Sequence, residues 1–195
     1  MRRRIVAPNP DGNARLSTRT TRLVPLAPEH LPGLRELELT EQTAFRWRHG
    51  GAHPSPSAFA AGAWADVLCS FLVVEAGIAA PRAIVSAYGA DQVNGFCRVG
   101  AARFGNGGPS PSFARGMFLF LDYLFDGWPF RKLYLEIPGF NLPQIKSFVD
   151  RFATIEATLP EHVYHADTYW DFHFVAINRT QWRAQEAARY PFLAR

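Results

Sequence analysis

The sequence predicts a single α/β domain with a mixed, mostly antiparallel central sheet of about seven strands, flanked by helices. Runs typical of strands and of helices alternate along the 195 residues in the order β-α-α-β-β-β-α-β-α-β-β. The chain is 48% hydrophobic, which is enough for a buried core without disulfide or metal supports. We find no internal repeat and no low-complexity segment, so one domain accounts for the pattern.

The first half of the chain supplies a strand, two helices and three more strands. Pro28 occupies a helix-entry position, and the helix that it opens turns Leu31, Leu34 and Leu37 inward. The β-rich runs that follow are bounded by glycine, proline and polar residues. The expected segments are a strand at 19–26, helices at 28–39 and 56–68, and strands at 71–75, 82–88 and 96–104.

The second half begins with a long amphipathic helix whose apolar residues recur at helical spacing, which predicts that it packs on the sheet. Asn141 is expected to cap the N-terminus of the next helix. A turn at residues 166–167 is expected to close the final hairpin. The expected segments are a helix from 113, a strand at 132–137, a helix after 141 and a hairpin at 163–177.

The charge balance is mildly basic, with a formal net charge of +4. This excess is compatible with an anionic partner such as a phosphorylated cofactor or a carrier protein. Much of it comes from residues 1–18, which we expect to form a flexible basic leader; a nucleic-acid partner is not expected. Residues 19–183 would form the domain, and residues 184–195 a C-terminal tail.

Cysteine usage and hydropathy predict the compartment. Cys69 and Cys97 lie in apolar surroundings without a partner motif, which indicates two buried thiols in a reducing environment. The basic start continues into prolines and polar residues where a signal peptide needs an apolar stretch. The longest apolar run, residues 67–81, is too short to span a bilayer. We therefore expect a soluble cytoplasmic protein with no membrane partner.

Five groups of residues stand out by their order and spacing: Thr21-Arg-Leu23, Asp122-Tyr-Leu-Phe125, Asn141, Asp171 and Arg179-Thr-Gln-Trp182. Together they resemble the GNAT superfamily of acyltransferases, and most closely its branch of ribosomal-protein-alanine N-acetyltransferases. The resemblance covers about residues 19–182. It implies a sheet splayed between its fourth and fifth strands, and transfer of an acyl group, expected in the first instance to be acetyl, from acetyl-CoA or another acyl-CoA. The acceptor would be an amine of a small molecule, peptide or protein.

The resemblance also implies where CoA binds. In this family the pantetheine arm enters the splay, and the pyrophosphate sits on amides at the start of the following helix, where the macrodipole favours an anion. The loop of this chain departs from the family pattern, because Pro109 and Pro111 replace small residues and have no N–H to donate. A rigid surface loop is the alternative. The implied CoA-binding residues are Ala101, Arg103, Gly105, Asn106, Gly107, Gly108, Ser110, Ser112, Phe113 and Asn141.

Acyl transfer to an amine needs a base, and it needs a donor to the thioester oxygen. The resemblance implies that this donor is a main-chain amide of the fourth strand, near residues 100–102, which include Ala101. Glu136 and Asp91 are the candidate catalytic acids near the expected cleft; for Glu136 a salt-bridged strand residue is the alternative. The tyrosine that many family members use as general acid is replaced by Phe148, which fits the core face of its helix.

On the acceptor side, the loop that walls the site in this family contains Trp47, His49 and His53. We take these as substrate-binding candidates, with solvated loop histidines as the alternative. The histidines and acids of residues 162–173 show no compact ligand spacing, so no metal is expected. Asp171 among them is expected to order the hairpin.

Two other readings stay open from the sequence. The same fold can use a carrier-protein- or tRNA-linked donor, which needs no cradle for the CoA pyrophosphate. A degenerate, non-catalytic GNAT binding module would also lack the loop glycines and the tyrosine. A third and weaker reading is an RNA-binding protein that uses the arginine-rich leader. A monomer or a homodimer is compatible with all of these.

Overall fold

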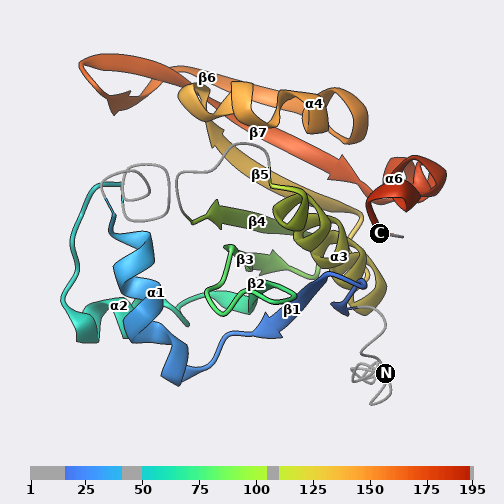
Figure 1. Ribbon diagram of the computed structural model, residues 1–195. Coiled ribbons are helices and arrows are strands. Elements are labelled where there is room, and N and C mark those ends of the chain that lie inside the picture. Colours follow the sequence, from blue (N-terminus) through green and yellow to red (C-terminus); the bar gives the residue numbers. More distant parts are fainter. Residues whose placement is uncertain (1–15, 41–49, 105–109, 194–195) are drawn as a thin grey trace.

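The computed structural model describes residues 16–40, 50–104 and 110–193, and within them seven strands form one sheet (Figure 1). The strand order is β1-β2-β3-β4-β5-β7-β6, and neighbours pair antiparallel except β4 and β5. The predicted fold class is confirmed. The strands are β1 (Thr21–Pro25), β2 (Val67–Glu75), β3 (Ala83–Asp91), β4 (Phe96–Arg103), β5 (Lys132–Pro138), β6 (Thr154–His165) and β7 (Thr168–Asn178).

Helices cover both faces of the sheet and create two cores. The larger core lies under α3 and α4 and contains Phe120, Leu133 and Ile177. The smaller core lies under α1 and α2, around Phe59 and Ile84. None of the helices in the described ranges is long and apolar enough to cross a membrane. The helices are η2 (Pro28–His30), α1 (Leu31–Glu38), α2 (Pro56–Gly62), α3 (Pro111–Gly127), η3 (Gly139–Asn141), α4 (Leu142–Phe152), α5 (Arg179–Ala184) and α6 (Glu186–Leu193).

The sheet is splayed between β4 and β5, as expected. These strands pair over three residues only, Phe96–Arg98 with Lys132–Tyr134. Beyond this point β4 continues to Arg103 next to β3, while β5 continues to Pro138 next to β7. Each strand is therefore fully paired on its outer side, and the two separate along the shared edge.

Some boundaries differ from the sequence prediction for identifiable reasons. The helix expected to reach residue 68 ends at Gly62, and β2 already begins at Val67; a short apolar run does not distinguish the end of a helix from a strand. Strand β6 begins at Thr154 instead of residue 163. It is an edge strand with mostly exposed side chains, so it lacks the apolar alternation that marks a half-buried strand.

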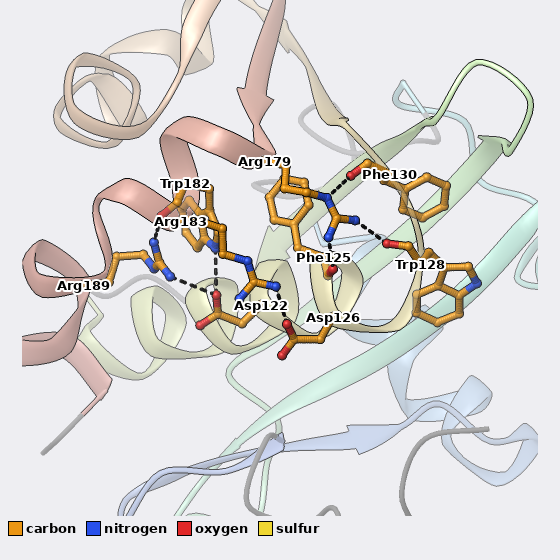
Figure 2. A network of polar contacts seen from close by, with 9 residues as sticks. All are labelled: Asp122, Phe125, Asp126, Trp128, Phe130, Arg179, Trp182, Arg183 and Arg189. Carbon is orange, nitrogen blue, oxygen red and sulfur yellow. Dashed lines mark hydrogen bonds and ion pairs between the residues drawn. The ribbon is translucent and has the colours of Figure 1, made fainter. Parts of the chain in front are cut away.

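The segment expected to be a C-terminal tail contains α6, which packs on α3 (Figure 2). The Arg189 side chain is buried, and its guanidinium lies 4.1 Å from the ring centroid of Trp182. Asp122 of α3 accepts hydrogen bonds from Trp182 Nε1 at 2.7 Å and from Arg189 Nη2 at 3.2 Å. Packed structure thus continues past residue 183. Of the expected leader, residues 1–15 lie outside the described residues, while Leu16 packs against the larger core.

Arg179 connects the C-terminal helices to the start of β5. Its guanidinium donates hydrogen bonds to three backbone oxygens, those of Phe125, Trp128 and Phe130 (Figure 2). Burial lowers the pKa of Arg179, the nearby Arg183 charge adds to this effect, and Asp126 opposes it. The three oxygens belong to the end of α3 and the turn into β5, so one cation satisfies helix C-terminal carbonyls and fixes the entry to β5.

Replacement of this cation is expected to destabilise the fold. Arg179→Met keeps much of the side-chain volume but leaves the three oxygens without their charged donor, which should cost about 2–4 kcal/mol of unfolding free energy. Arg183→Met is the matched control, because the partly exposed Arg183 makes an ion pair with Asp126 and should lose no more than about 1 kcal/mol. Urea unfolding followed by circular dichroism measures both values. Equal losses in the two variants would contradict the role of Arg179.

Candidate functional site

The splay exposes backbone groups of β4 toward the gap. Phe104 N donates to Arg82 O at the end of the β3–β4 ladder, so residues 98, 100 and 102 bond toward β3. The N–H groups of the intervening residues, Val99 and Ala101, then point toward β5, and Ala101 lies beyond the last paired residues of the two strands. Ala101 was the residue expected to lie at the thioester, and its amide has the orientation that an oxyanion donor needs.

A polar cluster lies beside the splay, on the sheet face that α1 and α2 partly cover. Arg98 of β4 and Glu136 of β5 form an ion pair with Nε and Oε1 2.7 Å apart. Their side chains are 39% and 23% exposed, respectively. Tyr88 of β3 donates its hydroxyl to Glu136 Oε2 at 3.5 Å. The two strands that flank the splay and the adjacent β3 therefore each contribute one polar side chain to the same place.

Burial and the Glu136 charge raise the pKa of Tyr88 to about 12, and Arg98 acts in the opposite direction. The phenol therefore stays protonated at neutral pH and acts as a donor to the carboxylate. The pKa of Arg98 is raised, mainly by its hydrogen bond to Glu136. The cluster at neutral pH is thus a neutral hydroxyl beside a matched cation and anion.

The α3 N-terminus, where a pyrophosphate was expected, already has partners for its polar groups. Ser110 caps the helix, with its Oγ accepting from Phe113 N at 3.3 Å. The Ser112 hydroxyl is buried and donates to Glu75 Oε2 at 3.0 Å. Arg82 Nε lies 3.2 Å from the same carboxylate oxygen. The helix therefore starts beside the Glu75 carboxylate, which forms an ion pair with Arg82.

Pro111 occupies the first turn of α3, where a backbone N–H lacks an intrahelical partner in any helix. Its missing donor therefore costs the helix nothing, but it removes one group that an anion could use. Gly105, Asn106, Gly107, Gly108 and Pro109 lie outside the described residues. Arg103, at the end of β4, is half-buried.

No protein-family model matches the sequence, and no curated protein matches it. Solved structures do match in fold. A GCN5-related N-acetyltransferase from Brucella melitensis is 21% identical, with a TM-score of 0.72 over 92% of this chain and 85% of that chain. A spermidine N-acetyltransferase from Vibrio cholerae, in complex with CoA and spermine, is 17% identical, with a TM-score of 0.70 over 84% and 98% of the two chains. AAC(6')-Ib, in complex with ribostamycin and coenzyme A, is 12% identical, with a TM-score of 0.67 over 86% and 98%.

The chain has the GNAT fold. Ala101 and Glu136 lie on the two strands that border the splay, and Ser110, Ser112 and Phe113 lie at the start of α3. The roles of these residues in binding CoA are a proposal.

Asp91 does not join this group. It lies in the β3–β4 turn, at the end of β4 opposite to the splay, where its carboxylate accepts from Asn94 N at 2.8 Å and from Asn94 Nδ2 at 2.7 Å. These hydrogen bonds lower the pKa of Asp91. The sequence placed Asp91 near the fourth strand correctly but could not show at which end of the strand the GNAT splay would open.

Asn141 does not cap α4. Its backbone is helical, with φ −93° and ψ −19°, and its side chain makes no capping hydrogen bond. The 3-10 turn η3 precedes α4 directly, and Leu142 N donates to Gly139 O. The carbonyl of the preceding turn therefore accepts a hydrogen bond from the first N–H of α4, as a capping side chain would otherwise do for an N–H of the helix.

Two other expectations are met. Phe148 packs among Phe118, Phe152 and Trp182, as its position on the core face of α4 predicted. Asp171 orders the hairpin, because its Oδ1 accepts from Glu161 N at 3.1 Å. Glu161 has a positive φ of 50°, so this bond holds an irregular point of β6.

The predicted substrate-binding residues lie in the loop before α2 or outside the described part. His53 is exposed in the turn before α2. Trp47 and His49 lie outside the described residues. Among the residues that are described, no group of His, Cys, Asp and Glu side chains has the arrangement of a metal site. Cys69 and Cys97 are free thiols, and burial raises the pKa of each to about 12.

Sequence reasoning missed Arg98, Tyr88 and Glu75. Arg98 is the informative case, because it interrupts the apolar residues of β4 on the same side as Gly100 and Ala102. A charged residue at such a position needs a partner on a neighbouring strand. The candidate Glu136 had been recognised, but the pairing of the two requires the parallel β4–β5 register, which local patterns do not reveal.

Glu75 is expected to oppose an anion at the α3 N-terminus. Glu75→Gln keeps an oxygen that accepts from Ser112 but removes the negative charge, so free CoA should bind about fivefold more tightly, a gain of about 1 kcal/mol. The gain should shrink as salt is added, because the interaction is electrostatic. Calorimetric titration at two ionic strengths measures it. Asp150→Asn, on the exposed face of α4, is the control, and a Glu75→Gln affinity equal to that of the control would contradict the effect.

Proposed function

We propose that this chain is an N-acyltransferase that moves an acetyl group from acetyl-CoA, or another acyl group from its CoA thioester, to an amine. The observation that carries the proposal is the splay, which turns the Ala101 amide into a gap bordered by Glu136. The fold shared with structures that contain CoA supports the donor. The two free thiols support a reducing, cytoplasmic compartment.

The thioester supplies the activated acyl carbon, and the chain supplies position and electrostatics. We assign the Ala101 N–H to the carbonyl oxygen, which becomes negative as the amine attacks. The departing thiol has an ordinary pKa of about 8.5, so it leaves without a strong acid. Phe148 in place of a tyrosine is therefore compatible with the reaction, because juxtaposition of amine and thioester provides most of the acceleration.

Glu136 is the carboxylate that we assign to the acceptor amine. It lies beside the splay, it is partly exposed, and Arg98 and Tyr88 hold it in place. A carboxylate in this position attracts the ammonium form of the amine and accepts its proton, directly or through water. The ion pair with Arg98 and the hydrogen bond from Tyr88 fix the carboxylate, and its partial exposure leaves it open to a ligand.

A second candidate function is favoured by a specific observation. At the start of α3, the Ser110 hydroxyl accepts a hydrogen bond from Phe113 N, and the Ser112 hydroxyl donates to Glu75. Both hydroxyls therefore already have partners within the chain. This arrangement suits a GNAT domain whose donor is linked to a carrier protein or a tRNA, or a domain that binds without catalysis. Neither kind of domain has to bind the pyrophosphate of CoA.

Titration separates these functions, and transfer assays define the reaction. Acetyl-CoA, longer acyl-CoAs and free CoA are titrated by calorimetry, and acyl transfer to a panel of amines, including a peptide with N-terminal alanine, is followed by mass spectrometry. Micromolar binding together with an acylated amine is the expected result. Absence of binding for the whole set at millimolar ligand would exclude the CoA-dependent function and favour the second candidate.

Glu136→Gln is expected to lower kcat/KM for acyl transfer by about 10²-fold, because the proton acceptor is lost while the shape is kept. Free CoA should bind to this variant as it does to the unmodified chain. Glu156→Gln is the matched control, since Glu156 of the edge strand β6 bonds to Lys132 and Tyr134 of β5, across the intervening β7. Full activity of Glu136→Gln over the pH range 6–9 would remove Glu136 from the mechanism.

A further inference from the structure

The acceptor side of the splay carries more negative than positive charge. Arg98 forms an ion pair with Glu136, and Asp66 lies close to the same guanidinium at Gly89. A Cβ on this glycine would lie 2.6 Å from Arg98 Nη1 and 3.6 Å from Asp66 Oδ2. Two carboxylates therefore share one cation, and the excess negative charge suits an ammonium group.

Two phenylalanine rings continue this face of the sheet from Glu136, on the side away from the gap. Phe174 of β7 lies directly opposite Glu136, and Phe172 lies opposite Pro138. Directly opposed residues of an antiparallel pair share a face of the sheet, with their Cβ atoms about 5 Å apart. The two rings contact each other edge to face, with centroids 5.6 Å apart. An apolar surface therefore begins next to the carboxylate that we assign to the amine.

The edge strand β6 extends this apolar surface. Ala157 lies opposite Phe174, and Leu159 lies opposite Phe172. The Leu159 side chain is 38% exposed, and the His162 ring centroid lies 5.6 Å from that of Phe172. The surface thus crosses from β5 over β7 to β6, and it is polar only at the end where Glu136 stands.

The two phenylalanines belong to neither core of the described residues. The larger core takes Val175 and Ile177 from β7, and these alternate residues point to the opposite face. The smaller core takes no described residue of β5, β6 or β7. Phe172 and Phe174 are half-buried, and neither packs against either core. Adjacent rings outside both cores, beside a few polar groups, are typical of a surface that contacts a ligand.

Resting on the proposed acyl transfer, we propose that the acceptor is a primary amine with an aromatic or long alkyl group, which binds its ammonium at Glu136 and its apolar group on Phe172 and Phe174. Both ends of such a ligand then meet a matching surface. A polyamine or an aminoglycoside would instead place charged or hydroxyl groups against the rings, at a cost in desolvation.

The rings act in specificity, because the group that they contact takes no part in bond formation. In the reaction the acyl carbon–sulfur bond breaks and an amide bond forms. One proton of the ammonium passes to Glu136 or water, and a second neutralises the departing thiolate.

The test compares amines that differ in the group attached to the nitrogen. Hexylamine and 2-phenylethylamine carry apolar groups, ethanolamine is a small polar amine, and spermidine is a polycation. Transfer from acetyl-CoA is measured by mass spectrometry, and binding of each compound is measured separately by calorimetry. We expect each apolar amine to exceed ethanolamine and spermidine by about tenfold or more in kcat/KM, the range for partial burial of such a group.

Variants of the apolar surface assign this preference to the rings. Phe172→Ser should lower the ratio of kcat/KM for hexylamine to that for ethanolamine by about fivefold or more, whereas Phe172→Leu keeps an apolar surface and should keep most of the ratio. Tyr169→Ser is the matched control, because this tyrosine of β7 is 65% exposed and points to the other face. Thermal melting shows that each variant is folded. Leu159→Ser, at an exposed position next to Phe172, replaces Phe172→Ser if that variant does not fold.

The outcomes are distinct. Equal or better use of ethanolamine or spermidine would overturn the inference, as would a preference for apolar amines that persists unchanged in Phe172→Ser or its replacement. If no compound is acylated, the proposed activity fails, and the binding data decide the inference alone. Hexylamine binding that weakens in Phe172→Ser or its replacement but not in Tyr169→Ser would support it. No binding of either apolar amine at millimolar concentration would overturn it.

Discussion

The site depends on one constraint: β5 does not pair along its whole length with both of its neighbours, β4 and β7. It pairs with β7 over its whole length, from Lys132 to Pro138, and with β4 over three residues. Arg179 fixes the start of β5 by binding carbonyls at the end of α3 and in the following turn. The strands are therefore held together at the end of β5 nearest this clamp, and they can only separate at the other.

The separation explains why polar groups gather in the middle of an otherwise apolar sheet. Where β4 and β5 diverge, backbone amides of β4 lose a strand partner, and the side chains of Arg98 and Glu136 beside the gap are partly exposed. Arg98 and Glu136 stand on either side of the divergence, so their ion pair spans it. The same geometry thus provides a backbone donor, a carboxylate and a cation within one short stretch of sheet.

The sequence predicted the class of fold because helical and strand periods alternate clearly, and it predicted Glu136 because a lone carboxylate stood out on β5. It did not predict α6, whose buried Arg189 looks like a surface residue until Trp182 and Asp122 surround it. It also missed Arg98, because its partner is on another strand. Local sequence patterns predict helices and strands well. Charged pairs between distant strands depend on the register in which the strands pair, and local patterns do not reveal that register.

The two sides of the splay differ in how their charges are arranged, and this difference bears on which ligand each can take. At the start of α3 an acid, Glu75, occupies the place where the helix dipole favours an anion, with Arg82 as its counter-ion. At the acceptor side Glu136 has its own counter-ion in Arg98. The charge of Asp66 also acts on Arg98, so the acceptor side has two carboxylates for one cation, whereas the start of α3 has one carboxylate for one cation. The excess negative charge favours an ammonium group at the acceptor side over an anion.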